Sequence, residues 1–534
     1  MSREAPFRHF RALTEAQARR HGDGTAILDR GRAMSFAELE AQTERLAGAL
    51  LRLGIEPGDR VGLWLPNVAA WLVSFLALAR IGAVSVAINL RFRSAELADV
   101  LGRSGAKALM FWPGFRGTDF AAVLDELPRE RRAALAVIAY DEGEETNLPW
   151  PAHRYGDLVR SEPVRLPEPR NRPCAVFTTS GTTRAPKFVL HDQATLLRHA
   201  HDCVRAFAYD APGAVALLAL PLSGVFGFCS ALPALVAGRP LIMAPGFDAA
   251  EQARQIDEHG VTHLNATSAM IEQLLAETDA ARPFPSLREL PFASFSPGLD
   301  SLLAEAEPRG LRLIGLYGSS ELQALAARQP ADAPVEERRQ AGGVLVAPEG
   351  RVRAVDPESR TVLPHGSPGE LEFRVPSRML GYLGDPDATA AAFTADGFFR
   401  SGDLGCSLAG NRFVFLARLG DTLRLGGYLV SPAEIEGVVE EVPVIDACQV
   451  VAIEQGKARR PVAFAIPRPG AEIDEAAVIA HCGRRLAKYK VPIRVFAIES
   501  FPVTEGPNGT KIQKNRLQEL ARRRLAEAQA EPGP

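Results

Sequence analysis

Residues 177–187 read Phe177-Thr-Thr-Ser-Gly-Thr-Thr-Arg-Ala-Pro-Lys187. An apolar segment, Ala175–Phe177, predicts a buried strand that runs into small hydroxyl and glycine residues and then a lysine. Such a loop offers backbone N–H groups and hydroxyls to an anion, and Gly181 permits close approach of the backbone. It is not a P-loop, because Pro186 stands where GxxxxGK[ST] requires glycine. The residues alone leave two interpretations, a phosphate-binding loop and a flexible polar surface loop.

The residues before this stretch alternate between strand-like and helix-like patterns. A capping box, Ser35-Phe-Ala-Glu38, predicts the start of an amphipathic helix that ends near Leu53. Strands alternating with helices of this length indicate βαβ units, so we expect an α/β fold whose sheets are mainly parallel and flanked by helices. The further elements predicted here are strands at 60–65, 83–90, 107–112 and 134–139, and helices at 68–80 and from Ser94.

A different pattern follows Val344. Short strands at 370–375, 398–400 and 413–417, separated by turn residues, predict a small antiparallel sheet. A second capping box, Ser431-Pro-Ala-Glu434, then opens a compact α+β unit. We therefore expect a large N-terminal domain, residues 1–420, and a small mobile C-terminal α+β domain, residues 421–534. The elements predicted in the small domain are strands at 445–453, 462–466 and 493–498 and a helix at 474–489.

Composition and charge exclude several classes of protein. The chain has 534 residues, of which 46% are apolar and 23% charged, and its net charge is −3. This balance is typical of globular proteins and argues against a general nucleic-acid binder, whose affinity comes largely from neutralising phosphates. The six cysteines include no CxxC pair, and the N-terminal residues are charged throughout. Both features favour a reduced, cytoplasmic protein over a disulfide scaffold, a structural zinc site or a secreted chain.

One uncharged run, residues 211–238, is long enough to cross a bilayer. It contains three prolines and several glycines, and it divides at Leu220-Pro-Leu-Ser-Gly224. We interpret it as a buried strand (Ala214–Leu220), a loop and a buried helix. We therefore expect no integral membrane segment.

The stretch from Thr179 to Lys187 resembles TSGTTGxPK, the phosphate-binding signature of the adenylate-forming superfamily. This superfamily includes acyl-CoA synthetases, firefly-type luciferases and the adenylation domains of peptide synthetases. Later landmarks appear in the family's order, so the resemblance covers nearly the whole chain. Tyr317-Gly-Ser-Ser-Glu321 is similar to YGxTE, Gly369-Glu-Leu371 is similar to GEL, and Ser401-Gly-Asp403 is similar to TGD. The hinge region of the family is matched by Arg418, Gly426-Gly427 and Ser431–Ile435. The C-terminal lysine motif is matched by Gly509–Lys514.

The resemblance implies a two-step reaction with ATP, Mg²⁺ and CoA. A small carboxylic acid attacks the α-phosphorus of ATP to give acyl-AMP and pyrophosphate, and a thiol then takes the acyl group. Positioning and charge stabilisation dominate such chemistry. The implied phosphate-binding residues are Thr179, Ser180, Gly181, Thr182 and Thr183, with Lys187 beside them. The other implied nucleotide contacts are Ser320 at the α-phosphate, Tyr317 at adenine, Asp403 and Arg418 at ribose, and Glu321 as the Mg²⁺ ligand. Gly298 and Gly318 are also implied to belong to the nucleotide-binding residues.

The small domain is implied to serve both steps. Lys511 reaches the carboxylate and the α-phosphate during adenylation. The family then rotates this domain about the hinge, which brings the Gly426-Gly427 loop to the active site for thiol attack. Read without the family, the basic run around Lys511 is a solvated helix face.

Each of the other site residues also has a structural interpretation. Glu321 follows a predicted strand, 311–317, at what we expect to be a strand-to-helix turn, where its carboxylate would stabilise a helix dipole. Lys187 is otherwise a solvated loop lysine, and Asp403 an ordinary turn residue. Arg418 is otherwise part of a surface ion pair of small energetic value.

Four positions depart from the family's pattern. Arg184 and Phe188 replace glycines near the phosphate loop, and Gly224 stands where many relatives carry a histidine beside the acyl substrate. Gly420 replaces the usual Asp or Lys at the hinge, which makes the pivot freer. None of these changes removes a charge needed for adenylation, so we expect an active enzyme.

The implied acyl pocket contains Phe226, Phe228 and Asn265 and is bordered by 296–298. These residues are apolar or small and include no cation for a second carboxylate, so we expect a fatty or aromatic monocarboxylic acid. Apolar pockets separate homologues by only about 1–3 kcal/mol per methylene, so the residues do not choose between these two classes. The leading hypothesis is an acid–CoA ligase. The alternatives are an acyl-AMP ligase that loads a carrier protein and a degenerate, non-catalytic binder of nucleotide or acyl ligand. The oligomeric state stays open.

Overall fold

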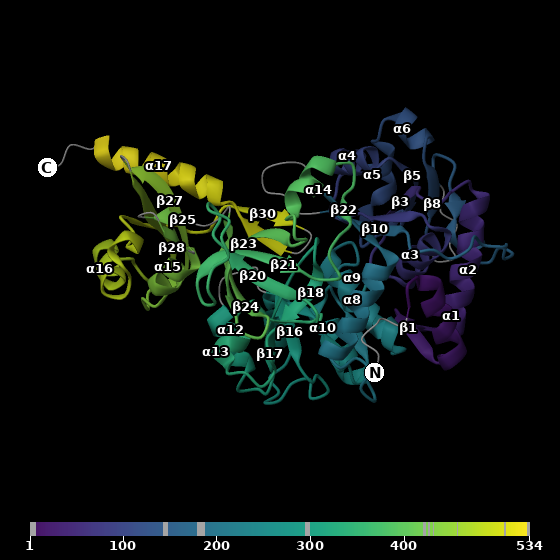
Figure 1. Cartoon of the computed structure of the whole chain (residues 1–534), viewed down its shortest axis with the longest axis horizontal. Coiled ribbons are helices and arrows are strands. Elements are labelled where there is room, and N and C mark those ends of the chain that lie inside the picture. Colours follow the sequence, from purple (N-terminus) through teal and green to yellow (C-terminus); the bar gives the residue numbers. More distant parts are fainter. Residues whose placement is uncertain are drawn as a thin grey trace.

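The computed structural model describes residues 7–141, 148–178, 187–293, 299–419, 423–425, 428–430, 432–455, 458–506 and 509–530. A large N-terminal domain is followed by a small C-terminal domain, which carries the elements from β25 (Leu423–Leu425) onward (Figure 1). The boundary expected at residue 420 stays a prediction, because residues 420–422 lie outside the described part of the chain.

The first sheet of the large domain has eight strands in the order β22-β11-β10-β4-β3-β5-β8-β9. Its neighbours pair in parallel from β10 to β9, whereas β11 runs antiparallel to both β10 and β22. The predicted parallel sheet is confirmed. The strands are β3 (Arg60–Trp64), β4 (Val84–Ala87), β5 (Ala106–Phe111), β8 (Ala136–Ala139), β9 (His153–Arg154), β10 (Pro173–Thr178), β11 (Phe188–Asp192) and β22 (Gly381–Tyr382).

Helices cover both faces of this sheet. The capping box at Ser35 is present: its Oγ accepts the Glu38 N–H at 3.1 Å, and the Glu38 carboxylate accepts the Ser35 N–H at 2.9 Å. An apolar cluster that includes Trp64 and Phe120 lies on one face of the sheet, and the main apolar core of the domain lies on the other face. The helices of this region are α1 (Phe10–His21), α2 (Phe36–Arg52), α3 (Ala69–Ile81), α4 (Ser94–Ser104), α5 (Phe120–Asp125), α6 (Arg129–Ala133), α7 (Tyr155–Leu158) and α8 (Gln193–Ala206).

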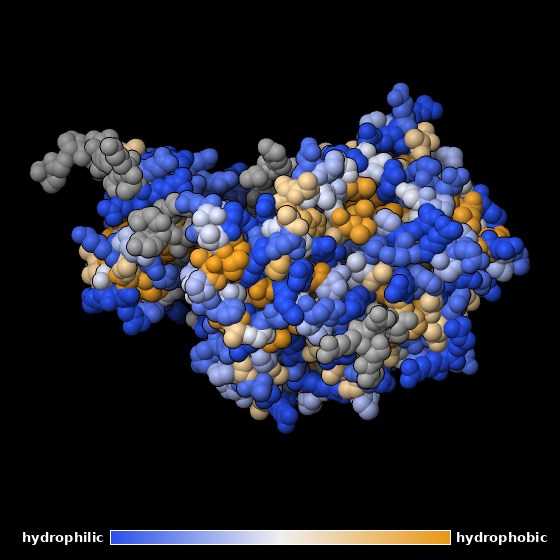
Figure 2. Space-filling model, viewed as in Figure 1, coloured by the Kyte–Doolittle hydropathy of each residue, from blue (hydrophilic) through white to orange (hydrophobic). Residues whose placement is uncertain are grey.

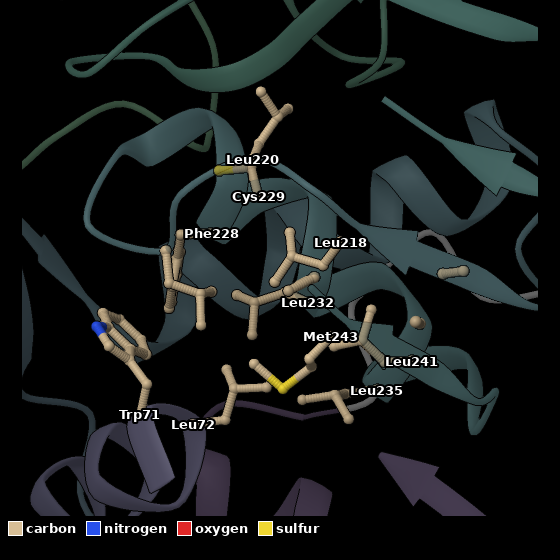
Figure 3. Packing of buried hydrophobic residues seen from close by; sticks show 14 of the residues in the cluster. Trp71, Leu72, Leu218, Leu220, Phe228, Cys229, Leu232, Leu235, Leu241 and Met243 are labelled. Carbon is tan, nitrogen blue, oxygen red and sulfur yellow. The ribbon is translucent and has the colours of Figure 1, made fainter. Parts of the chain in front are cut away.

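The largest apolar core lies between this sheet and a five-stranded sheet of order β14-β12-β13-β1-β2. Trp71 of α3 faces Phe228 of α9 (Val225–Ala237), and Leu218 of β12 and Met243 of β13 lie to their right in the same cluster (Figure 3). The strands are β1 (Thr25–Asp29), β2 (Arg32–Ser35), β12 (Ala216–Leu218), β13 (Leu241–Met243) and β14 (His263–Leu264).

The uncharged run at 211–238 forms β12 and then helix α9 (Val225–Ala237), and both are buried. The predicted order of strand, loop and helix is therefore confirmed. In the described part of the chain, we find no helix with the length and apolarity needed to span a bilayer.

The third sheet is mixed and has nine strands in the order β15-β16-β17-β18-β19-β24-β23-β21-β20. The predicted antiparallel strands are present, and they continue directly from the parallel strands β15–β17 instead of forming a sheet of their own. The strands are β15 (Ala266–Thr267), β16 (Leu290–Ala293), β17 (Leu313–Ser319), β18 (Gln323–Arg328), β19 (Gly342–Leu345), β20 (Arg351–Val355), β21 (Pro368–Arg374), β23 (Phe399–Leu408) and β24 (Arg412–Arg418). The helices near it are α10 (Ala249–His259), α11 (Ser268–Ala276), α12 (Leu299–Ala306), α13 (Val335–Arg338) and α14 (Pro386–Ala392).

The small domain is built on the antiparallel pair β27 (Ile445–Gln455) and β28 (Ala458–Pro467), with β29 (Val495–Ala497) parallel to β28. Helices α15 (Pro432–Glu440) and α16 (Glu475–Arg485) pack on one face, and α17 (Lys514–Ala530) packs on the other. A hairpin of β30 (Val503–Gly506) and β31 (Gly509–Ile512) carries the backbone of Lys511 opposite Thr504. A short pair, β25 (Leu423–Leu425) and β26 (Tyr428–Val430), begins the domain.

Hydrophilic residues cover most of the face shown in Figure 2, and apolar residues appear there as separate patches. Among the described residues, the large apolar side chains that are exposed are Val344, Val362, Leu380 and Val503.

Candidate active site

A buried cluster joins Tyr317 on β17 to Asp403 on β23. The Tyr317 hydroxyl donates to Asp403 Oδ2 at 2.5 Å, and Arg418 Nη1 lies 2.9 Å from Asp403 Oδ1. These strands are four positions apart in the sheet, which in a flat sheet would separate them by about 19 Å. The sheet must therefore curl, and stacked rings of Tyr317 and Phe373, 5.3 Å apart, fill its interior.

The electrostatics of this cluster follow from its burial. Asp403 is 1% exposed. Loss of solvent raises its pKa to about 6, although Arg418 and the Tyr317 hydroxyl both act in the opposite direction. Burial and the neighbouring Asp403 raise the pKa of Tyr317, so this hydroxyl stays a hydrogen-bond donor. Within the described part of the chain, Oδ1 of Asp403 has the Arg418 ion pair but no donor in hydrogen-bond geometry.

The sequence Ser401-Gly-Asp403 explains how β23 presents this carboxylate. Gly402 has φ +67°, a left-handed conformation that bends the strand and favours glycine. The Ser401 hydroxyl donates to the carbonyl of Leu371 at 2.6 Å and accepts the Asp403 N–H at 3.0 Å. The neighbouring Glu370, from the GEL landmark, accepts the Gly402 N–H at 3.3 Å. Two of the predicted landmarks thus hold each other in place.

The turn that carries Glu321 differs from the prediction. The predicted strand-to-helix turn is wrong, because β17 turns back into the antiparallel strand β18, so no helix begins at Glu321. The segment after Glu321 is rich in Leu and Ala, which are strong helix formers, but the pairing of β18 with β17 on one side and β19 on the other overrides that preference. Gln323 and Leu325 have φ values of +65° and +64°, which no right-handed helix accommodates.

Gly318 has a steric reason to be glycine. A Cβ atom at this position would lie 2.7 Å from the Cα of Ala324 across the turn. The close approach of β17 and β18 therefore requires the glycine of the Tyr-Gly landmark.

Glu321 itself is half-buried and contacts a tyrosine that no motif predicted. The Tyr382 hydroxyl donates to Glu321 Oε1 at 3.0 Å, and the Met379 N–H donates to the Glu321 carbonyl at 2.7 Å. Burial and Glu321 raise the pKa of Tyr382, so its hydroxyl also stays a donor. Lys187 is exposed, and its Nζ lies 4.4 Å from the centroid of the Tyr382 ring.

Buried polar side chains hold this turn from behind. His191 Nε2 donates to the Ser320 carbonyl at 2.8 Å, and His199 Nε2 donates to the Ala324 carbonyl at 2.6 Å. The Gln323 amide donates to the carbonyls of Ser377 at 2.9 Å and Thr195 at 3.1 Å. Because β11 begins directly after Lys187, these contacts tie the phosphate-loop region to the Glu321 turn. The sequence analysis missed these residues, and the only signal was a polar side chain within an apolar segment.

Both histidines predict a loss of stability in acid. Desolvation lowers the pKa of each to about 4 from 6.5. The unfolded chain therefore binds protons first, and stability falls as the pH drops from 6.5 towards 4, by roughly 3 kcal/mol for each histidine. We expect His199→Gln to flatten this slope in urea unfolding between pH 7 and pH 4. Asp403 contributes equally to both proteins, so an unchanged slope would contradict the assignment.

A magnesium ion fits this site only in company with a phosphate ligand. Among the described residues, no group of three or more His, Cys, Asp and Glu side chains could hold a metal. Glu321 offers one half-buried carboxylate. Mg²⁺ commonly takes one or two carboxylates together with phosphate oxygens, so this donor fits a metal that arrives with a nucleotide.

The residues implied for the acyl pocket lie in the core beside the site. Phe228 is 0% exposed, and its ring contacts those of Phe75 at 4.9 Å and Phe177 at 5.1 Å. Phe226 is buried one residue after the start of α9, and the Asn265 amide donates to Ser230 Oγ at 3.0 Å. Phe228 thus packs into the core shown in Figure 3.

Phe188, one of the four positions that depart from the family's pattern, is part of an apolar cluster of the large domain. Its ring is buried, and the Arg103 guanidinium lies 4.4 Å from its centroid. Gly224 directly precedes helix α9.

The structure brings together Lys187, Tyr317, Ser320, Glu321, Asp403 and Arg418 through the contacts described above. It describes only the backbone of Lys511. The other predicted site residues lie outside the described part of the chain: Thr179, Ser180, Gly181, Thr182, Thr183, Gly298, Gly426 and Gly427, together with Arg184, Gly420 and the Ser431 cap.

Comparisons with known proteins agree with this geometry. Residues 14–383 match the family of AMP-binding enzymes, and residues 434–506 match the C-terminal domain of AMP-binding enzymes. A methyl-dioxo-octahydro-indenyl-propanoyl:CoA ligase of Mycobacterium tuberculosis is 30% identical over 523 residues, 95% of this chain and 98% of that protein. A feruloyl-CoA synthase of an Amycolatopsis species is 30% identical, over 93% of this chain and 95% of that protein.

Solved structures share the fold. ATP-bound MatB from Rhodopseudomonas palustris superimposes with a TM-score of 0.81 at 24% identity, and the match covers 96% of this chain and 98% of that one. Both parts of the chain match their family models in the expected order. The Tyr317–Asp403 and Tyr382–Glu321 hydrogen bonds lie in one region, because Tyr317 and Tyr382 belong to the same apolar cluster. The chain therefore belongs to the AMP-binding enzyme family, the adenylate-forming superfamily that its motifs resemble.

Proposed function

We propose that the protein is an ATP-dependent acid–CoA ligase. A carboxylic acid and ATP give acyl-AMP and pyrophosphate, and CoA then takes the acyl group and releases AMP. The observation that carries the proposal is the buried Tyr317–Asp403 pair, with the exposed Arg418 guanidinium ion-paired to Asp403. Two relatives named as a CoA ligase and an acyl-CoA synthase, each 30% identical over nearly the whole chain, support CoA as the acceptor.

The chain's own residues account for nucleotide binding. In this proposal Asp403 accepts hydrogen bonds from ribose hydroxyls, and Arg418 keeps its carboxylate oriented through the 2.9 Å ion pair. Bound Mg²⁺ would supply neutralisation of the phosphate oxygens. Glu321 offers one ligand to it, and Lys187 adds positive charge next to the phosphate loop. With the negative charge of the phosphate oxygens screened, the carboxylate of the substrate would attack the α-phosphorus, and pyrophosphate would leave.

The small domain is proposed to serve both half-reactions from residues 421–534. Lys511 stabilises charge during adenylation, and the Gly426-Gly427 loop opens the path for the thiol after rotation about the hinge at 420. The support is the match of residues 434–506 to the family's C-terminal domain and the sequence landmarks.

We propose a fatty or aromatic monocarboxylic acid as the substrate, and ring-bearing acids are the first to test. Feruloyl and indenyl-propanoyl groups, named in two relatives, both contain rings. Phe226 and Phe228 give the neighbourhood of α9 an apolar character that suits such groups.

The test is pyrophosphate release from Mg²⁺-ATP with a panel of aliphatic and aromatic acids, each with and without CoA. We expect fast turnover that requires CoA and one class of acid. Pyrophosphate release that does not depend on CoA but increases with a phosphopantetheine carrier protein would mean that the carrier protein, and not CoA, is the acceptor. ATP binding without release for any acid would support a non-catalytic binder.

Nucleotide affinity should depend on pH through Asp403. Because the pKa of this carboxyl is raised to about 6, it becomes protonated as the pH falls through 6 and then accepts fewer hydrogen bonds from ribose. We expect the Kd for AMP to rise severalfold between pH 7.5 and pH 5.5 in calorimetric titrations. Asp403→Asn should bind weakly at both values. A wild-type Kd that stays constant would argue against a ribose contact.

A further inference from the structure

We propose that Tyr382 is a positioning residue that sets the orientation of the Glu321 carboxylate for the metal–nucleotide complex and seats Lys187 against its ring. The inference rests on the proposed function, because it assigns Glu321 and Lys187 to the nucleotide. Tyr382 stands in none of the landmarks from which the site was predicted. It enters through the structure alone.

The backbone of Tyr382 is fixed on two sides. Strand β22 pairs with β11 so that Tyr382 lies opposite Val189, two residues after Lys187. The Tyr382 N–H donates to Thr389 Oγ1 at 2.8 Å, which anchors the strand to helix α14. The side chain is 9% exposed and packs with Val189 and Tyr317. A ring held this firmly can impose a geometry on groups that touch it.

Two parts of the side chain then contact two different charges. The hydroxyl donates to Glu321 Oε1 at 3.0 Å, so it engages one carboxylate oxygen and limits rotation of the group. The ring face lies 4.4 Å from Lys187 Nζ, within the range of cation–π attraction. One side chain therefore relates the position of the proposed metal ligand to that of the proposed phosphate-binding lysine.

A packing role and a positioning role predict different results for Tyr382→Phe. Phenylalanine keeps the ring and its packing but removes the hydrogen bond to Glu321. If the ring only fills space, the variant binds Mg²⁺-ATP like the wild type. If the hydroxyl orients the carboxylate, the variant loses part of the gain in ATP affinity that Mg²⁺ provides.

The experiment measures the Kd for ATP by calorimetry in EDTA and in Mg²⁺, with no acid and no acceptor present. The ratio of the two values is the magnesium linkage. We expect Tyr382→Phe to reduce this ratio about tenfold, as for loss of a hydrogen bond to a charged group, and to leave the Kd in EDTA unchanged. Tyr155→Phe, which changes a buried tyrosine on α7 beside the opposite edge strand β9, is the matched control and should keep the wild-type ratio.

Two further variants separate the parts of the proposal. In a Glu321→Gln background, Tyr382→Phe should have no additional effect on the ratio, because its partner charge is gone. Tyr382→Leu also removes the ring and should weaken ATP binding in EDTA about threefold through Lys187. A lower melting temperature would reveal that Tyr382→Phe is unstable. In that case the variant would also change the ratio in the Glu321→Gln background.

If the magnesium linkage of Tyr382→Phe equals that of the wild type, the positioning role is overturned while the proposed function stays intact. Equal EDTA affinities for Tyr382→Phe and Tyr382→Leu would overturn the seating of Lys187. Failure of the wild-type chain to bind ATP at all would overturn the proposed function together with this inference.

Discussion

Glu321→Gln is expected to lower the rate of acyl-adenylate formation by about 10²–10³-fold, the loss typical of removing one preorganised charge-stabilising group. Glutamine has the same shape and can still accept the Tyr382 hydrogen bond, and the Met379 contact to the backbone carbonyl is unaffected. The variant should therefore fold normally. What it loses is the negative charge that holds the metal–nucleotide complex.

The measurement is ATP–pyrophosphate exchange at saturating acid over a range of Mg²⁺ concentrations, with the melting temperature recorded alongside. The Mg²⁺ concentration for half-maximal rate should rise in the variant. Glu349→Gln is the matched control, because this exposed carboxylate pairs with Arg198 on the large domain, away from the described site contacts. A rate within threefold of the wild type at low Mg²⁺ would remove Glu321 from the role of metal ligand.

Local sequence patterns predicted the elements that depend on local chemistry. The Ser35 capping box and the strand–helix alternation from residue 60 to residue 139 are found where the patterns placed them. Helix α15 likewise begins at Pro432, as the second capping box indicated. Caps and periodicity act over three or four residues, so a single sequence contains the information.

The prediction failed where distant residues decide the structure. Residues 323–328 favour a helix by propensity, but they form β18 because β17, across a tight turn, and β19, further along the chain, supply pairing partners on both sides. The contact from His191 to Ser320 spans 129 positions, and that from Tyr382 to Glu321 spans 61. No local pattern encodes such pairs. The motifs therefore predicted which residues form the site but not the side chains that hold them in place.

These supporting contacts also connect the predicted landmarks to several elements of the large domain. The Glu321 turn touches β11 through His191, α8 through His199 and β22 through Tyr382. Asp403 reaches the same region because the curled sheet brings β23 to Tyr317. Buried hydrogen bonds tolerate little displacement, so these contacts limit movement of the Glu321 turn relative to β11, α8 and β22.

Lys511→Ala is expected to reduce acyl-AMP formation by about 10²–10³-fold while leaving thioester formation from supplied acyl-AMP within threefold of the wild type. The resemblance places this lysine at the α-phosphate only during adenylation. The second half-reaction is proposed to use the Gly426-Gly427 face of the same domain. Loss in one half-reaction and not the other is what a domain with two working faces requires.

The two half-reactions are measured separately, by ATP–pyrophosphate exchange and by conversion of synthetic acyl-AMP with CoA. Lys514→Ala is the matched control: it removes a lysine three positions away whose Nζ lies 3.4 Å from Glu436 within the small domain. Gly427→Leu should show the reverse pattern, with exchange retained and thioester formation blocked, because the added side chain narrows the thiol path. Equal losses in both half-reactions for Lys511→Ala would mean that the lysine supports the fold or a single conformation, and the division of labour between two faces would have to be abandoned.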